Sequence, residues 1–104
     1  LRAPLIIVVI AKIKIHPKVP EIEQIISAGC AAHSIMLAAH AYGFAGIWRT
    51  GINAYDQRVG LGLGLLVSEK IVGFLYLGSI DGNYKPLKEL DVRDFCQSWE
   101  TMST

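Results

Sequence analysis

The chain has 104 residues, of which 52% are apolar and 18% are charged, so it holds one domain at most. A folded chain of this length buries only about 60 to 70% of its extended surface, and a mean hydropathy of +0.39 therefore leaves more apolar surface than one subunit covers. We expect a homo-oligomer, most simply a twofold dimer. The formal charge of +1, with no block of one sign, argues against nucleic acid as a partner.

The two cysteines and the start of the sequence bear on the compartment. No secretory leader pattern precedes the first apolar run, and Cys30 lies among small apolar residues, where we expect a buried structural thiol. These features favour a cytoplasmic protein with Cys30 and Cys96 reduced. The sequence begins at Leu1 without an initiator methionine and enters an apolar run at once, so we expect a fragment of a longer domain.

The first two elements follow from the apolar pattern. Residues 5–11 are a continuous run rich in β-branched side chains, which predicts a strand covered on both faces, in the middle of its sheet. Pro17 and Pro20 end that strand. Acidic residues after Pro20 and a stop at Gly43 then predict a helix over residues 21–42.

Helical periodicity places one broad, mostly apolar stripe on the helix over residues 21–42. The stripe consists of Ile22, Ile25, Ile26, Gly29, Cys30, His33, Met36, Leu37 and His40. Alanines occupy much of the remaining surface and would let another backbone approach closely. Two interpretations stay open for this surface, dense packing in the core and a seam between two copies of the chain.

A membrane span must also be considered, because residues 24–48 carry no formal charge and are long enough to cross a bilayer. Two histidines, interrupting glycines and the lack of a flanking basic cluster favour a soluble helix instead. We therefore expect no membrane partner.

Shorter elements fill the rest of the chain. Residues 44–51 predict an extended segment, residues 53–64 a short helix that ends in a glycine-rich turn, and residues 71–78 a second buried strand. The glycines at the end of that helix lack the spacing of a dinucleotide-binding motif. Residues 79–85 predict a turn, and the apolar residues of the following tail predict that it docks across another surface.

Two clusters could carry chemistry. His33 and His40 are seven residues apart, about 10.5 Å along a helix, which is too far for one zinc ion, so we expect no metal site. In residues 46–51 an arginine, an indole and a hydroxyl lie beside glycines. This segment is either a cradle for an anionic, aromatic ligand or a strand with a surface Arg49 and a core Trp48.

Several separated motifs, in order, resemble the C-terminal half of the nitroreductase-like flavoproteins, in the branch of compact bacterial NAD(P)H nitroreductases. These motifs are Glu23-Gln24, Ser27-Ala28-Gly29-Cys30-Ala31, Ala38-Ala39, Gly43-Phe44, Gly46-Ile47-Trp48-Arg49-Thr50-Gly51 and Lys70-Ile71-Val72-Gly73-Phe74-Leu75-Tyr76-Leu77-Gly78. The resemblance covers residues 1–78 well and the tail only loosely.

The resemblance implies an α+β fold, here a partial nitroreductase-like domain over residues 1–104 with central sheet strands, a long packed helix and an intertwined homodimer. It implies FMN at two interface sites and hydride transfer from NAD(P)H through the flavin to nitroaromatic or quinone-like acceptors. The flavin does this chemistry, so no protein nucleophile or general base is expected.

The resemblance also assigns site residues. Trp48, Arg49 and Thr50 would contact FMN, with Arg49 near its phosphate, and residues 86–104 would dock on the partner. The nicotinamide nucleotide would lie along Ala38, Ala39, His40, Ala41, Tyr42 and Gly43. An N-terminal half with an Arg-Arg-Ser type motif, present in the family, is missing here. The alternative is therefore a truncated, self-associating fold fragment without flavin or activity.

Overall fold

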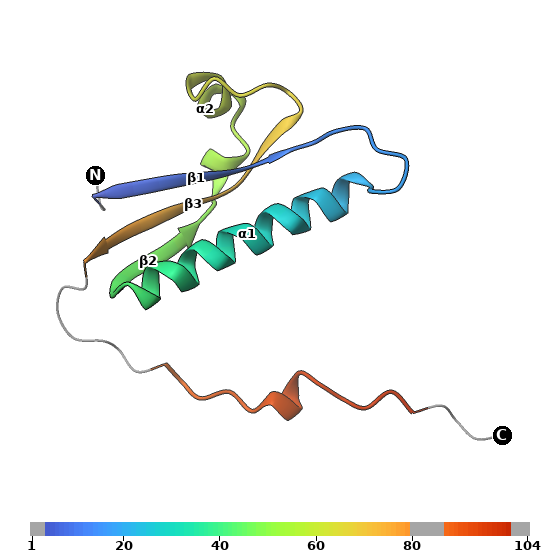
Figure 1. Ribbon diagram of the computed structural model, residues 1–104, viewed down its shortest axis with the longest axis vertical. Coiled ribbons are helices and arrows are strands. Elements are labelled where there is room, and N and C mark those ends of the chain that lie inside the picture. Colours follow the sequence, from blue (N-terminus) through green and yellow to red (C-terminus); the bar gives the residue numbers. More distant parts are fainter. Residues whose placement is uncertain (1–3, 80–86, 101–104) are drawn as a thin grey trace.

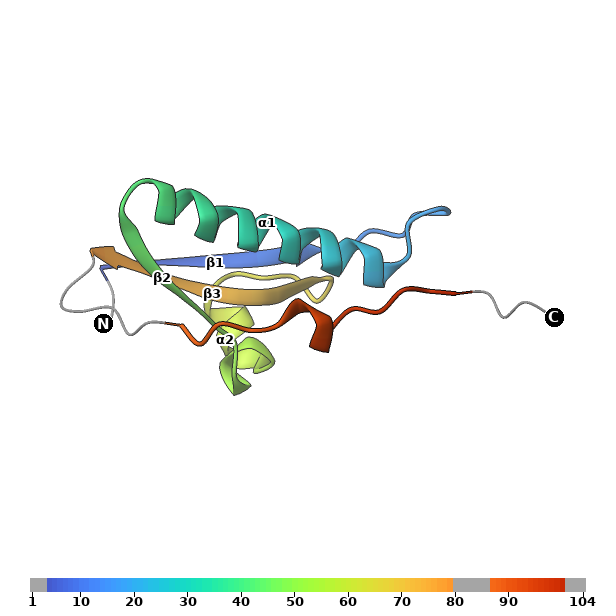
Figure 2. The same ribbon diagram turned by 90° about the horizontal axis from the view of Figure 1, so that it is seen from below.

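The computed structural model describes residues 4–79 and 87–100 and shows a three-stranded sheet with a long helix on one face (Figure 1). In chain order the elements are β1 (Leu5–Lys12), α1 (Glu21–Ala41), β2 (Phe44–Arg49), α2 (Gln57–Gly62) and β3 (Glu69–Ser79), with 3-10 turns at Ile52–Ala54 and Val92–Asp94. Seen from below, α1 and α2 lie on opposite sides of the sheet (Figure 2). The α+β class and the three predicted strands are confirmed.

The sheet is antiparallel, with strand order β1-β3-β2. The prediction that residues 5–11 lie in the middle of the sheet is wrong for the part of the chain described here, because β3 takes that place and β1 pairs with it along one edge. An apolar run indicates that both faces of β1 carry apolar side chains. It does not indicate whether the strand pairs with a neighbour along one edge or along both.

Local interactions set the ends of α1. The Gln24 side chain accepts a hydrogen bond from the Lys14 N–H at 2.9 Å and donates to the Lys14 and Val19 carbonyls at 2.8 and 3.0 Å, which ties the preceding loop to the first turn. At the other end the helix stops at Ala41, and Gly43 takes a φ of +85°, a conformation that favours glycine.

The face of α1 that packs on the sheet differs from the predicted stripe. Its buried or half-buried residues are Gln24, Ile25, Ala28, Gly29, Ala32, Ile35, Met36 and Ala39. Predicted members such as Ile22, Ile26 and Leu37 are instead more than half exposed. Cys30 is exposed as well, so the expectation of a buried thiol is wrong. The helix is apolar nearly all round, and periodicity therefore could not single out the packed face.

Trp48 joins the helix to the sheet at a β-bulge. The β1–β3 register skips Val72 between the pairs Val9–Gly73 and Ile10–Ile71, and the Trp48 indole N–H donates to the Val72 carbonyl at 3.4 Å. A Cβ added at Gly73 would lie 2.7 Å from Trp48 Cδ1, and one added at Gly29 would lie 4.0 Å from the far edge of the ring. The indole therefore occupies space that the missing side chain of Gly73 leaves open, and its far edge lies at an ordinary contact distance from Gly29.

The uncharged run over residues 24–48 does not form one span. It divides between α1, which ends at Ala41, and β2, which begins at Phe44. By length and composition α1 alone could cross a membrane, but one of its faces packs on all three strands. The opposite side of α1 is exposed.

Residues 53–64 form two pieces rather than the single predicted helix. A 3-10 turn at Ile52–Ala54 precedes α2, and the Asp56 side chain caps α2 by accepting a hydrogen bond from the Arg58 N–H at 2.8 Å. The side chain and N–H of Arg58 lower the pKa of the Asp56 carboxyl. The capping residue is thus Asp56, which the sequence interpretation placed inside the helix.

The buried core is small. Val9, Ala32 and Leu75 form its centre, and the radius of gyration is 18.1 Å, compared with about 13 Å for a compact domain of 100 residues. Residues 87–100 are exposed throughout, and they extend away from α1 (Figure 1). The predicted turn over residues 79–85 lies, apart from Ser79, outside the described residues.

Candidate functional site

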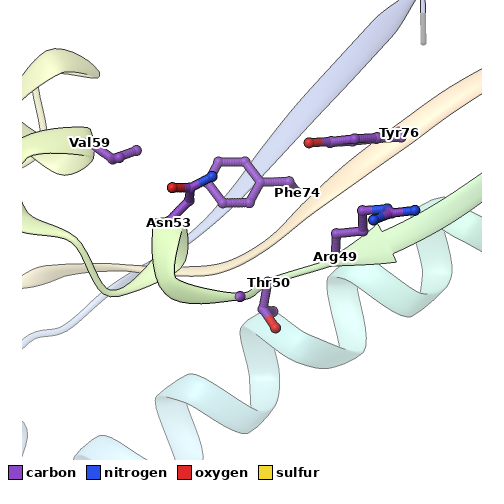
Figure 3. A pocket seen from close by; sticks show the side chains of 7 residues that line it. Arg49, Thr50, Asn53, Val59, Phe74 and Tyr76 are labelled. Carbon is purple, nitrogen blue, oxygen red and sulfur yellow. The ribbon is translucent and has the colours of Figure 1, made fainter. Parts of the chain in front are cut away.

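A pocket of about 500 Å³ lies at the end of β2, on the sheet face opposite α1. Its lining residues are Arg49, Thr50, Gly51, Asn53, Val59, Phe74 and Tyr76. We call it the Arg49 pocket, and Figure 3 shows its side chains. The pocket combines one cation, two aromatic rings and a side-chain amide, which are groups that suit a flat ligand with a negative charge, while the Thr50 hydroxyl at its edge points away from them (Figure 3).

Strand register gathers these side chains. Arg49 is opposite Phe74 and Ile47 is opposite Tyr76, and because strand residues alternate between faces, all four lie on the face away from α1. Gly51 has a φ of +67° and lets the chain turn into the 3-10 segment, which carries Asn53 to the side of Phe74 (Figure 3). Trp48, the residue before Arg49, points to the opposite face, towards α1.

Arg49 differs from the other arginines that the structure describes. Arg58 and Arg93 each form an ion pair with an aspartate two residues earlier, at 3.0 and 2.8 Å. Within residues 4–79 and 87–100, Arg49 forms no ion pair; its guanidinium carbon lies 5.9 Å from the centre of the Tyr76 ring. An aromatic face attracts the cation but takes up none of its in-plane donors, so the N–H groups stay available for an anion.

The predicted site residues lie in three separate places. Arg49 and Thr50 line the pocket, whereas the Trp48 indole packs towards α1. The segment from Ala38 to Gly43 lies where α1 joins β2, at the opposite end of β2 from Arg49. A six-residue strand is roughly 17 Å long, so one chain does not bring this segment to the Arg49 pocket.

Sequence reasoning missed Asn53, Phe74 and Tyr76 as pocket residues. Phe74 and Tyr76 alternate with buried Leu75 along β3, so a common face for the two rings could be predicted. Their placement beside Arg49 depends on the β2–β3 register, which links residues about 25 positions apart and has no local signal.

A second, more apolar cavity of about 670 Å³ lies between α2, the first half of α1 and the start of β3. Ile25, Leu61 and Ile71 contribute to its lining, and the ion pair of Lys70 with Glu21 joins β3 to the start of α1 beside it. None of the predicted site residues lines this cavity.

The histidines have separate surroundings. His33 and His40 are exposed on the outer side of α1, and His16 Nδ1 accepts hydrogen bonds from the N–H groups of Lys18 and Val19 at 3.0 and 3.2 Å. In the part of the chain that the structure describes, no three His, Cys, Asp or Glu side chains lie close enough to hold a metal ion.

We predict that Cys30 and Cys96 stay unpaired with each other. Both thiols are exposed and free, one on the outer side of α1 and the other in the extended tail. Mass spectrometry of freshly purified, unreduced protein should give the mass of the dithiol form. A mass lower by two hydrogen atoms per chain would show that the tail reaches α1 and would contradict the cytoplasmic expectation.

Comparisons with known proteins agree on one family. The sequence profile described as the Nitroreductase family matches residues 1–79. The putative NAD(P)H nitroreductase YdjA of Escherichia coli is 51% identical over 78 residues, which cover 75% of this chain and 43% of that protein. A putative NAD(P)H nitroreductase of Haemophilus influenzae is 32% identical over 96 residues, covering 90% of this chain and 52% of that protein.

Solved structures show the same fold. A nitroreductase-like family protein from Bacillus cereus superimposes with a TM-score of 0.77 at 21% identity, over 92% of this chain and 51% of that one. The NADPH:FMN oxidoreductase of Vibrio harveyi, solved with NAD+, gives 0.67 at 20% identity, over 80% and 36%. This chain spans about half the length of the curated relatives it matches. It belongs to the nitroreductase family.

Proposed function

We propose that this chain is the flavin-binding C-terminal half of an FMN-dependent oxidoreductase that transfers hydride from NAD(P)H to nitroaromatic or quinone-like acceptors. The observation that carries the proposal is Arg49, a cation beside two aromatic rings that no described carboxylate neutralises. The names of the relatives, which are NAD(P)H nitroreductases and an NADPH:FMN oxidoreductase, support it.

The residues present fit FMN. Arg49 supplies the donors that suit a phosphate, Asn53 offers both a donor and an acceptor to a ring edge, and Thr50 lies at the edge of the pocket. Phe74 gives the pocket flat apolar surface, and Tyr76 lies beside Arg49. When bound, FMN supplies the hydride chemistry, while Arg49, Asn53 and Phe74 would bind and orient the cofactor.

The proposed site needs more than one copy of this chain. Residues 38–43, proposed to border the nicotinamide nucleotide, and the Arg49 pocket lie at opposite ends of β2. In our proposal a second subunit brings the two regions together, and residues 86–104 dock on that subunit as a tail. Leu87, Phe95 and Trp99 of this tail are 95%, 71% and 94% exposed, as expected for apolar side chains awaiting a partner. We place the protein in the cytoplasm.

Titration of FMN against the 104-residue chain, followed by flavin fluorescence, tests the proposal. The chain alone should purify nearly colourless and bind weakly, because the residues of the Arg49 pocket must by themselves offset the cost of immobilising the cofactor. Adding the N-terminal half of a family protein should raise the affinity and yield a yellow complex. No binding with that half present would favour the alternative, a self-associating fragment without flavin.

We predict that the chain is a dimer whose seam includes the outer side of α1. Ile22, Ile26 and Leu37 are 65%, 58% and 57% exposed there, and burying such side chains is worth about 1.5–3 kcal/mol each. Leu37→Asp should shift the light-scattering mass from dimer to monomer at micromolar concentration. Ile15→Asp, at a fully exposed loop position, is the matched control. A wild-type particle of 11.4 kDa would refute the dimer.

A further inference from the structure

The Arg49 guanidinium lies over the ring of Tyr76. The ring centre lies 5.9 Å from the guanidinium carbon, near the outer limit of about 6 Å for a cation–π interaction. The two residues come from neighbouring strands and are diagonal partners on one face, since Arg49 is opposite Phe74, two residues from Tyr76. Figure 3 shows the two side chains next to each other.

The Tyr76 ring has a fixed place in the sheet. β3 is the middle strand, so Tyr76 has a same-face neighbour on each side, Ile6 on β1 and Ile47 on β2. Cross-strand neighbours of this kind restrict an aromatic side chain. Arg49, by contrast, is at the end of an edge strand with an exposed side chain. The ring is therefore the more ordered member of the pair.

We propose that Tyr76 is a positioning residue that holds Arg49 in the pocket without neutralising it. This inference rests on the proposed function of the pocket. A carboxylate in the same place would occupy the guanidinium donors, as Asp56 does for Arg58 and Asp91 does for Arg93. The ring face attracts the cation and leaves its in-plane N–H groups directed at a phosphate.

Substitutions at Tyr76 separate the ring face from the hydroxyl. Tyr76→Phe keeps the ring face and should therefore weaken FMN binding by less than Tyr76→Leu does. Tyr76→Leu keeps the apolar bulk but removes the ring face, so it should weaken FMN binding by about three- to tenfold. Tyr55→Leu is the matched control, because Tyr55 lines the second cavity and not the Arg49 pocket.

A double-mutant cycle identifies positioning as the cause. In an Arg49→Ala background, Tyr76→Leu should cause no further loss of FMN affinity, because no guanidinium remains to be held. An equal loss in both backgrounds would mean that Tyr76 contacts the ligand or supports the fold directly. That result would overturn the inference while leaving the flavin proposal intact.

Nuclear magnetic resonance of the free 104-residue chain tests the contact without any ligand. The Arg49 Nε–Hε resonance should be shifted upfield by the Tyr76 ring, should keep that shift in Tyr76→Phe and should lose it in Tyr76→Leu. FMN is then titrated to millimolar concentration on the same samples. A shift that Tyr76→Leu does not change would overturn the positioning role. If the resonance shows the expected shift but FMN does not bind, even with an N-terminal half added, the proposed function is refuted while the contact between Arg49 and Tyr76 stands.

Discussion

Gly73→Ala should destabilise the fold more than any other single methyl addition at a glycine that the structure describes. The added Cβ would overlap the Trp48 ring, 2.7 Å from Cδ1 and 2.9 Å from Cε2. Gly29 of α1 lies beyond the far edge of the ring, where a Cβ would be 4.0 Å from the indole. Forced overpacking of this kind costs about 1–3 kcal/mol, measured as the free energy of unfolding in urea at one fixed protein concentration.

Two controls isolate the cause of that loss. Gly62→Ala adds the same methyl near the end of α2 where nothing lies within 4 Å, so it should be neutral or raise stability by up to about 1 kcal/mol. In a Trp48→Leu background the penalty of Gly73→Ala should shrink, since a smaller side chain leaves room for the Cβ. If the loss of stability stays the same in that background, a clash with the Trp48 ring is not its cause, and an effect of the substitution on the backbone is.

Local sequence signals predicted the elements well. Each of three elements has a signal in its own segment: the β-branched run for β1, the glycine that follows α1, and the apolar run for β3. The predicted ends of these three elements agree with the structure within one or two residues. The face of α1 that packs on the sheet was not predictable in the same way. Ile22 and Ile25 are equally apolar, and only the sheet distinguishes the exposed from the half-buried one.

The candidate site was predictable only in part, because some of its residues are brought together by strand pairing. Arg49 and Thr50 stand out in the sequence because a charge and a hydroxyl beside glycines are unusual in an apolar chain. Phe74 and Tyr76 look like ordinary strand residues, and their role depends on the pairing of β2 with β3. Such long-range pairing follows from the whole fold and not from any short segment.

Arg49 is the one cation among the residues that line the pocket. With an N-terminal half supplied, Arg49→Ala should weaken FMN binding by about 1.5–3 kcal/mol, the usual contribution of a charge-assisted hydrogen bond. Flavin fluorescence measures the dissociation constant. Arg58→Ala is the matched control, because Arg58 is engaged by Asp56 and does not line the pocket; this variant should bind FMN normally.

Riboflavin, which lacks the phosphate, tells which part of the ligand Arg49 holds. If the guanidinium binds the phosphate, the wild-type complex should prefer FMN to riboflavin by about 10- to 150-fold, the equivalent of 1.5–3 kcal/mol, and Arg49→Ala should remove most of that preference. If Arg49 instead contacts the ring, the variant should weaken both ligands equally. An Arg49→Ala protein that binds FMN as tightly as the wild type would remove Arg49 from the site.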